Sequence, residues 1–490
     1  MVFSPSSLAQ AEQRLIVATV AEATDLDPRI NYDVYSFQRM YTIMEPLLAF
    51  APDLSLEPRL ATSWAFSEDG SQLVLELRQG VLFHHGREFN AEDVRYTFEW
   101  MLNPDNPAAN PGLFRDIARI EVLDDYNLVF HLAQENSFIL NSLARLHIVP
   151  HDLAEEEGFG RNPVGTGPFV FESWNRDDRM IVRAFEDYWG GRAHVDVVEF
   201  RPITEDATRL LAFEAGEIDL FHGQVVPGEV ARLEQDPNVV VQRATGLGHA
   251  YVGFNMRNPD LQDVRVRQAI SHLLPREAIV ARVLQGIGQV GVSPISPEVP
   301  WFNPDTPRYD YNPERARELL QEAGVERLQL RLHTNENPVR VQIAEILQFE
   351  AERVGIDIQV SVEEFGAFIA RILDVEQADY DLFLLGWTGN VDPNYAMFGL
   401  FHSQGDNNYV AYSNPALDVL LEQGRRVPPS TDASNAIYQE AQVLLMQDPP
   451  FAFINYTEEI GLNQPHVHGW VLHPYVSASF QNLHLVTVER

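Results

Sequence analysis

Residues 57–94 read EPRLATSWAFSEDGSQLVLELRQGVLFHHGREFNAEDV. This stretch joins a strand, two turns and the start of a helix in a fixed order. The positions that define the order are Pro58, Leu60, Ala61, Trp64, Ser67, Asp69, Gly70, Leu75, Leu77, Arg78, Gly80, Val81, Phe83, Gly86, Ala91, Asp93 and Val94. Because one strand and turn pattern can arise on any mixed α/β protein, the rest of the chain has to agree with it.

Five further blocks follow along the chain, and the whole set spans residues 15 to 485. The blocks are NPVGTGPF (162–169), LAFEAGEID (211–219), DVRVRQAI (263–270), YNPERARELL (311–320) and YDLFLLGW (380–387). Together with residues 57–94 they resemble family 5 extracytoplasmic solute-binding proteins. Members of that family are the peptide, nickel and opine receptors of bacterial ABC importers.

The bulk composition agrees with a large folded protein. At 490 residues the chain exceeds the size at which one hydrophobic core keeps growing, so two or three domains are expected. Apolar residues make up 45% and charged residues 22%, which is ordinary for a globular chain. No stretch is apolar for long enough to predict a membrane span. The absence of cysteine excludes disulfides, thiolate catalysis and cysteine metal sites.

The N-terminus is similar to part of a secretion signal. Ser4 to Ala11 is similar to the end of a secretory signal, with Ala9-Gln10-Ala11 as the small-residue cleavage pattern. No basic segment or long apolar segment precedes it, which suggests a truncated start; a plain disordered tail is the alternative. A periplasmic or other extracytoplasmic location is therefore expected.

The charge limits the partners. A formal net charge of -36 disfavours nucleic acid and anionic membranes, because polyphosphate would be repelled. Lysine does not occur, so every fixed positive charge is an arginine. This suits an alkaline or saline exterior, although GC-rich codon usage explains the same bias.

Strand and helix signals alternate along the chain, which predicts an α/β fold. The expected segments are a strand over 14–20 and helices over 91–102, 204–215, 313–324 and 338–355. Thr204 is expected to cap the third segment, with Gly216 past its end. Proline at the first helical position opens the last two helices.

The segment 328–362 predicts a strand, a helix and a second, parallel strand. Residues 380–386, YDLFLLG, form another apolar run of strand length, and Trp387 lies at its carboxyl end. In open α/β sheets, ligands bind beyond the carboxyl ends of the strands. The loop from Trp387 to Tyr395 is therefore predicted to lie at a binding cleft.

The family resemblance implies a two-lobed periplasmic-binding-protein-like fold with an inserted third domain and discontinuous lobes joined by a hinge. The expected domains are lobe I over 12–50, 164–252 and 456–490, an inserted domain II over 51–163, and lobe III over 253–455. No linker of distinct composition separates these segments, as expected for domains that the chain visits more than once.

A secreted chain of this length is also compatible with a hydrolase, so its enzyme-like motifs need an interpretation. Residues 286–291 match GxGxxG, but they follow a helical run, 277–284, rather than the strand that dinucleotide binding requires. A hydrolase would have to use paired carboxylates such as Glu363 and Glu364. No cofactor and no enzymatic activity are expected.

Two histidine pairs are the candidates for a metal site. His84 and His85 are adjacent on a strand and therefore point to opposite faces. His466 and His468 follow a turn with few carboxylates near them. No metal is expected at either pair. An aspartate commonly stands in the family where His85 stands here.

The resemblance also implies ligand-binding residues after the strand that ends at Trp387. The predicted residues there are Trp387, Thr388, Gly389, Asn390, Asp392 and Tyr395. Trp387 would supply a flat apolar wall. Dipeptide and oligopeptide receptors typically place an aspartate for the ligand's ammonium where this chain has Asn390, and Asp392 is a candidate substitute.

A second group of predicted ligand-binding residues comes from other segments. In dipeptide receptors an arginine that binds the ligand's carboxylate stands where this chain has Thr334, with Asn335 next to it; Arg340 and Arg331 are candidate replacements. From the first lobe, Tyr32 and Val34 follow the Asp-Pro turn near which family members contact ligand.

The predicted function is capture of a peptide-like solute by hinge closure and delivery to the permease subunits of an ABC importer. Both ends of the dipeptide clamp are altered, so a longer peptide is favoured over a dipeptide. The alternatives are an oligosaccharide or other uncharged polar solute, and less favoured, a metal chelate or opine. A monomer is expected, as is typical of the family.

Overall fold

A computed structural model describes residues 12–31, 33–109, 111–136, 138–223, 225, 227–373, 379–389, 391–405, 407–427 and 431–489. The predicted signal remnant, Tyr32 and Asn390 lie outside the described residues. In the described ranges, no helix has the length and apolar character needed to cross a membrane.

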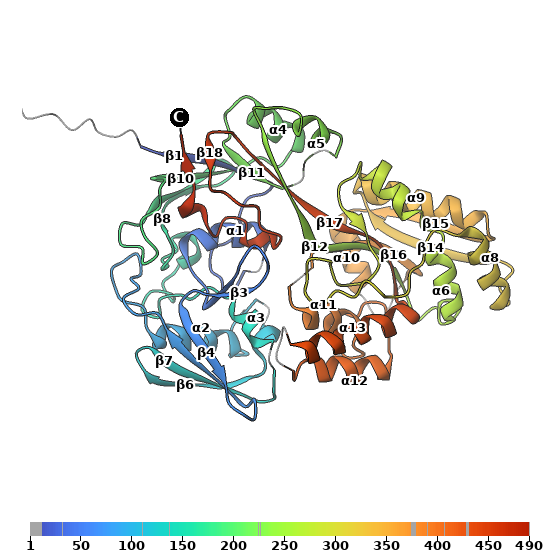
Figure 1. Cartoon of the computed structure of the whole chain (residues 1–490), viewed down its shortest axis with the longest axis horizontal. Coiled ribbons are helices and arrows are strands. Elements are labelled where there is room, and N and C mark those ends of the chain that lie inside the picture. The colour runs from blue at the N-terminus through green and yellow to red at the C-terminus, as the bar shows by residue number, and fades with distance from the viewer. Residues whose placement is uncertain are drawn as a thin grey trace, which may run out of the picture. The chain divides into compact units, whose positions relative to one another are not determined.

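The chain forms two compact units. Unit 1 comprises Met1–Gln134, Ser142–Arg243 and Glu459–Arg490, and unit 2 comprises Glu135–Asn141 and Ala244–Glu458. The chain crosses between the units at 134/135 and 141/142, and again within two long strands, β12 (Val240–Phe254) and β17 (Phe451–Asn463), which are labelled in Figure 1. Because two of the crossings lie inside strands, composition alone does not mark them. The division into three domains stays a prediction.

Unit 1 contains a mixed sheet in the order β17-β11-β1-β10-β9-β8. The bounds are β1 Arg14–Thr19, β8 Phe169–Asn175, β9 Arg179–Ala184, β10 Val197–Pro202 and β11 Leu220–His222. Parallel β10 and β11 flank β1, and β9 pairs antiparallel with β10. The predicted strand over 14–20 is confirmed, ending one residue earlier.

A second, four-stranded sheet of unit 1 has the order β4-β5-β7-β6. Its strands are β4 (Ala61–Phe66), β5 (Gln72–Leu77), β6 (Ile117–Asp124) and β7 (Asn127–Leu132), and short strands pair as β2 (Leu48–Phe50) with β3 (Leu56–Pro58) and as β18 (Val467–His468) with β19 (Thr487–Val488). Residues 57–94 supply β4, β5 and the start of α2, so the predicted helix start is confirmed but two strands form where the sequence predicts one.

The helices of unit 1 are α1 (Val34–Ile43), α2 (Ala91–Leu102), α4 (Asp206–Glu214) and α5 (Pro227–Leu233), and α3 (Ile139–Leu143) lies where the chain returns to unit 1. The prediction that Thr204 caps α4 is wrong. Glu205 is the N-cap, and its carboxylate accepts from the N–H groups of Ala207 and Thr208. A carboxylate can satisfy both donors and also interacts favourably with the helix dipole, so it displaces the hydroxyl.

Unit 2 is built on a sheet in the order β15-β14-β16-β12-β17. Here β14 (Leu328–Asn335) pairs parallel with β15 (Ile356–Glu363) and with β16 (Leu382–Trp387), whereas β12 pairs antiparallel with β16. Its short strand β13 (Gln289–Val290) pairs with β17. The predicted parallel strand–helix–strand segment is confirmed, with β16 on the other side of β14.

The helices of unit 2 are α6 (Val264–Ser271), α7 (Arg276–Ala278), α8 (Pro313–Glu322), α9 (Pro338–Glu352), α10 (Phe365–Leu373), α11 (Pro393–Phe401), α12 (Pro415–Gly424) and α13 (Asp432–Gln447). A π-helical turn, Ile279–Val283, continues α7. The core packs α6, α8 and α9 against one sheet face through residues such as Ile343, Leu347, Leu332 and Leu384. This packing fixes the N-terminus of α9 near the carboxyl end of β14.

Candidate ligand-binding site

The predicted binding residues of unit 2 gather where strands β14 and β16 end. Leu332 of β14 is in register with Leu382 of β16, and the two strands run parallel. Asn335 and Trp387, which end these strands, therefore lie at the same edge of the sheet. This is the edge at which open α/β sheets bind ligands.

Trp387 provides a flat apolar surface at this edge. Its indole is half-buried, and its ring lies 6.1 Å from the ring of Tyr395, at an interplanar angle of 32°. Tyr395 comes from α11, which begins six residues after Trp387. Thr388, between them in sequence, is exposed. The structure thus brings Trp387 and Tyr395 together, as a binding wall requires.

Two glycines hold the loop after Trp387 against β12. Gly389 has a φ of 74°, and a Cβ there would lie 1.9 Å from the Leu247 carbonyl oxygen. At Gly248, a Cβ would lie 2.6 Å from the Trp387 carbonyl oxygen. Any larger residue at either position would push the loop away, so the glycines fix the place of the Trp387 backbone.

Asp392 lies in the same loop, but its carboxylate serves the backbone. It is the N-cap of α11, and its Oδ1 accepts from the N–H groups of Asn394 (2.8 Å) and Tyr395 (3.3 Å). Its exposed fraction is 6%. The carboxylate thus orients the helix that carries Tyr395, and its predicted contact with a ligand ammonium stays a prediction.

Thr334 and Asn335 end β14 with their polar groups already engaged. The Thr334 side chain is fully buried, and its hydroxyl donates to the Leu384 carbonyl at 3.0 Å. The Asn335 amide oxygen accepts from Nη1 of Arg340 at 2.8 Å. Both residues therefore tie β14 to its neighbours and orient Arg340.

The two candidate arginines differ in their partners. Arg331 forms ion pairs with Asp379 and Asp381. Arg340, in the first turn of α9, has no carboxylate ion pair among the described residues, and it lies so close to β16 that a Cβ on Gly386 would be 3.3 Å from its Nη2. Burial lowers the pKa of Arg340, an effect that the nearby Tyr251 opposes. Arg340 is thus a desolvated cation beside the Gly386 backbone, and no described carboxylate pairs with it.

Sequence reasoning did not single out two further polar residues, His249 and Tyr251 of β12. His249 lies directly opposite Trp387 in the antiparallel pair. The period-two spacing of His249 and Tyr251 places both on one face, and this spacing was the signal available in the sequence. Neither residue belongs to a motif, so only the pairing with β16 reveals their position.

In unit 1, Val34 is half-buried and is the first residue of α1. The segment before it is well anchored. Arg29 is 4% exposed, pairs with Asp27 at 2.8 Å, and lies 4.6 Å from the centre of the Trp100 ring. The side-chain amide of Asn31 donates to the Thr24 hydroxyl at 2.7 Å. These contacts fix the backbone that leads to Tyr32 and Val34.

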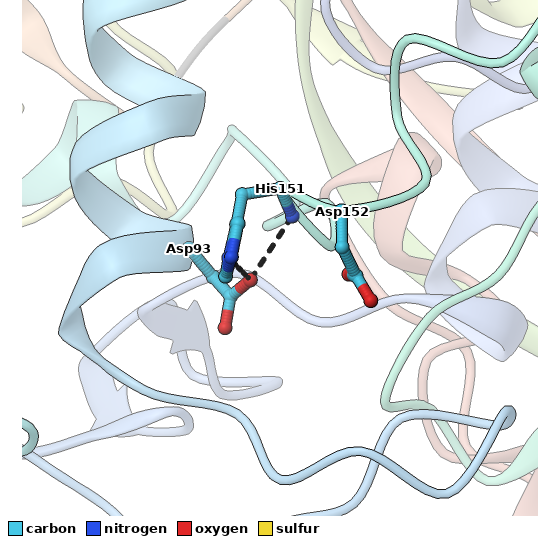
Figure 2. Close-up of side chains that lie close together, drawn as sticks. All are labelled: Asp93, His151 and Asp152. Atoms are coloured by element: carbon cyan, nitrogen blue, oxygen red, sulfur yellow. Dashed lines mark hydrogen bonds and ion pairs between the residues drawn. The ribbon is translucent and has the colours of Figure 1, made fainter.

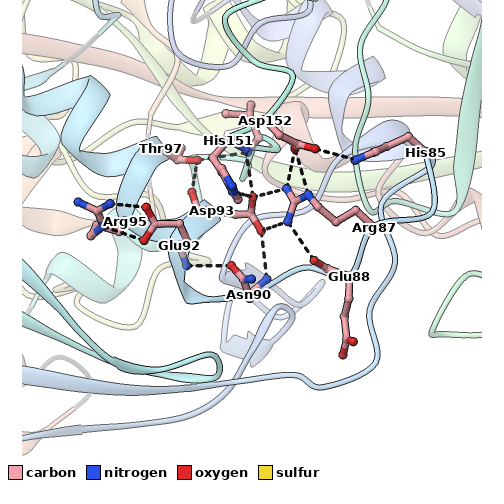
Figure 3. Close-up of polar contacts among 11 residues, drawn as sticks. His85, Arg87, Glu88, Asn90, Glu92, Asp93, Arg95, Thr97, His151 and Asp152 are labelled. Carbon is pink, nitrogen blue, oxygen red and sulfur yellow. Dashed lines mark hydrogen bonds and ion pairs between the residues drawn. The ribbon is translucent and has the colours of Figure 1, made fainter.

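One group in the described chain has the residue types of a metal site: Asp93, His151 and Asp152, shown in Figure 2. Asp93 is fully buried on α2, and its Oδ1 lies 2.7 Å from His151 Nδ1. Arg87 also reaches this group, as Figure 3 shows. Its Nη2 lies 2.6 Å from Asp93 Oδ1 and 2.8 Å from Asp152 Oδ1. The guanidinium neutralises both carboxylates, so we assign no metal to the group.

The two adjacent histidines have separate roles. His84 is half-buried, and its Nε2 lies 3.0 Å from the Gly167 carbonyl oxygen. His85 instead contacts Asp152, with 3.3 Å between Nε2 and Oδ2 (Figure 3). Where the family commonly has an aspartate, His85 thus adds a polar contact to the Asp152 side of the Arg87 cluster.

The carboxylates considered for a hydrolase are engaged elsewhere. Glu363 accepts from His333 Nδ1 (2.5 Å) and Arg371 Nε (2.9 Å), and Glu364 accepts from the N–H of Ala367 (3.0 Å). One carboxylate is part of an ion-pair network and the other serves a helix start. Their arrangement does not indicate acid–base chemistry.

An apolar wall and a lone cation at the ends of α/β strands are features of a protein that binds a small solute. The comparison with known families agrees. Residues 55–409 match the model of bacterial extracellular solute-binding proteins, family 5, middle region. The chain belongs to this family, and the predicted α/β fold with more than one domain is confirmed.

Several relatives resemble the chain over nearly its whole length. The oligopeptide-binding protein AppA of Bacillus subtilis is 27% identical over 490 residues, covering 94% of this chain and 89% of the relative. Its structure, solved in complex with a nonapeptide, has a TM-score of 0.81 at 26% identity and covers 98% of this chain and 100% of its own. The periplasmic binding protein DppA of Helicobacter pylori, in complex with the peptide STSA, has a TM-score of 0.82 at 28% identity, with coverage of 97% and 98%.

Proposed function

We propose that this solute-binding protein captures a peptide at the carboxyl ends of β14 and β16 and delivers it to the permease of an ABC importer. The observation that carries the proposal is Arg340, a desolvated guanidinium without a carboxylate partner among the described residues, beside the backbone of Gly386, which precedes Trp387 at the end of β16. A peptide supplies both a carboxylate and apolar side chains.

The isolation of Arg340 is informative because the chain is so acidic. With 71 Asp and Glu against 35 Arg, a carboxylate partner is easily found. Arg331, on β14, has two carboxylate partners. A buried cation without a counter-ion costs free energy. A ligand carboxylate would remove that cost and form charge-assisted hydrogen bonds of about 1.5–3 kcal/mol.

The other predicted residues would complete the site. Trp387 and Tyr395 would pack against ligand side chains, and Gly389 would allow the backbone at 387–389 to approach the ligand. Thr388 and Asn390 would supply hydrogen bonds there. Asp392 caps a helix, which weakens its candidacy for the ligand's ammonium. A peptide longer than a dipeptide, recognised through its carboxylate, fits this set best.

The mechanism requires no catalysis. Contacts from Tyr32 and Val34 of unit 1 would add to those of unit 2, and a ligand that binds the closed state more tightly shifts the population toward it. Strands β12 and β17, in which the chain passes between the units, would act as the hinge. We propose that the protein works outside the cytoplasm as a monomer. An uncharged sugar is the weaker alternative, because it leaves Arg340 unneutralised.

The test compares the peptide Ser-Thr-Ser-Ala with its C-terminal amide by titration calorimetry. Loss of the carboxylate is expected to weaken binding to the wild type at least about tenfold, and Arg340→Gln is expected to bind both forms with similar affinity. Arg353→Gln, at the exposed end of the same helix and paired with Glu350, is the matched control. Equal affinity of the wild type for the acid and the amide would refute the role of Arg340.

A further inference from the structure

His249 and Tyr251 share a sheet face with Trp387. In the antiparallel pair of β12 with β16, His249 lies opposite Trp387 and Tyr251 lies opposite Leu385. Directly opposed residues of an antiparallel pair point to the same face, and so do residues two apart on one strand. The rings of His249 and Tyr251 are 5.5 Å apart, edge to face. The three side chains therefore adjoin one another beside the proposed ligand site.

Their polar atoms are buried and unpaired. Both ring nitrogens of His249, the Tyr251 hydroxyl and the Trp387 indole nitrogen have no hydrogen-bond partner in another described residue. His249 is 1% exposed and Tyr251 is fully buried. Native proteins rarely leave such atoms unpaired, because each lost hydrogen bond costs stability. Their gathering on one face indicates that something outside the chain pairs with them.

The protonation states of these groups limit the kind of ligand that can pair with them. Burial lowers the pKa of His249 to about 4 and raises the pKa of Tyr251, so both are neutral at pH 7. The charge of Arg340 opposes the rise at Tyr251, because the guanidinium lies near that hydroxyl. Neutral donors and acceptors beside a cation suit a guest with an uncharged hydrogen-bonding group near its carboxylate.

We propose that His249, Tyr251 and the Trp387 indole N–H form a polar floor that binds a hydroxyl or amide side chain of the captured peptide. The inference rests on the proposed function and names its substrate class: peptides with Ser, Thr, Asn or Gln near the carboxyl end. A hydroxyl or amide both donates and accepts, as the imidazole and the phenol require. An apolar side chain would leave the floor unpaired, and a cationic one would lose its hydration without a counter-charge.

The test compares Ser-Thr-Ser-Ala with Ala-Val-Ala-Ala, which keeps the carboxylate and the approximate shape but lacks the hydroxyls. By titration calorimetry the wild type is expected to bind Ser-Thr-Ser-Ala at least about tenfold more tightly. Tyr251→Phe and His249→Phe are expected to reduce this preference to about twofold or less. The ligand-free melting temperature of Tyr251→Phe is expected to stay the same or rise, because an unpaired buried hydroxyl is removed.

The matched control is Tyr380→Phe. The Tyr380 hydroxyl donates to the Tyr409 carbonyl at 2.9 Å, and its ring also packs on Phe383. Its removal is expected to lower the melting temperature and to leave the preference intact. Equal binding of the two peptides by the wild type, or an intact preference in Tyr251→Phe, would overturn the polar floor alone. Binding of neither peptide would overturn the proposed function and this inference with it.

Discussion

Burial favours the neutral form of several histidines of the described chain. Burial lowers the pKa of His84, His249 and His484 to about 4, and that of His147 to about 3. His147 lies against the rings of Phe37 (5.4 Å) and Tyr41 (4.4 Å). In the unfolded chain these histidines would take up a proton near pH 6.5. Below that pH the unfolded state binds more protons than the folded state, so stability falls as the pH falls.

The variant His147→Phe measures how much the protonation of this one histidine contributes to the pH dependence of stability. Between about pH 6.5 and pH 4, the free energy of unfolding of the wild type should fall with decreasing pH. That of the variant should fall less steeply, and the two slopes should differ by about 1.4 kcal/mol per pH unit. Urea unfolding at pH 8, 6 and 5 measures this, and the difference at pH 8 reports packing alone. Parallel pH curves for the two proteins would show that His147 does not contribute.

Single residues also mark the limit of what the sequence could predict. Trp387 and Gly389 were predicted from their place after an apolar strand, because a strand's carboxyl end is visible in the sequence. The partners of Thr334, Arg331 and Arg340 were not, because they depend on side-chain contacts between segments far apart along the chain. Only those contacts distinguish Arg331, which pairs with two carboxylates, from Arg340, which has no carboxylate pair among the described residues.

Among the elements, helices with strong local signals were predicted closely. The predicted bounds of α2 are those observed, and α8 and α9 begin at the predicted prolines. The residues that cap these helices lie within a few positions of the helix ends along the chain, so the local sequence is enough to predict where the helices begin. At α4 the sequence predicts the Thr204 hydroxyl as the cap, but the carboxylate of the next residue, Glu205, takes that role in the structure.

The N-terminus of α2 is also an anchor for a distant loop. Asp93, in its first turn, accepts from the backbone N–H of Asn90 (3.1 Å) and of His151 (3.0 Å), and also pairs with Arg87. The capping box and the ion pair thus share one buried carboxylate, as Figure 3 shows. This carboxylate ties α2 to the segment around His151.

The variant Asp93→Ala is expected to lower the free energy of unfolding by about 3 kcal/mol or more, because it leaves Arg87 and several donors without their acceptor. Denaturant unfolding measures the loss. Glu92→Ala, the adjacent residue with an exposed pair to Arg95, is the control and should cost less than about 1 kcal/mol. Similar losses in the two variants would contradict the anchoring role of Asp93.

At the scale of the whole molecule, the sequence predicted the fold because its blocks occur in order over nearly the entire chain. The predicted three-domain division, with boundaries at 252/253 and 455/456 among others, stays a prediction. The structure divides into two units at 134/135, 141/142, 243/244 and 458/459, and the last two lie inside β12 and β17, where no change of composition marks them. The sheet register that brings His249 next to Trp387 could not be predicted from the sequence either, because it depends on the pairing of strands far apart along the chain.

The central claim is that the protein holds a solute against Trp387 without altering it. Titration calorimetry of the wild type and Trp387→Ala with Ser-Thr-Ser-Ala tests this most directly, with melting temperatures measured in parallel. A buried aromatic anchor is worth about 2 kcal/mol or more, so the variant's Kd should rise at least about tenfold, while the half-buried indole costs little stability when removed. An unchanged Kd in a folded variant would contradict the account.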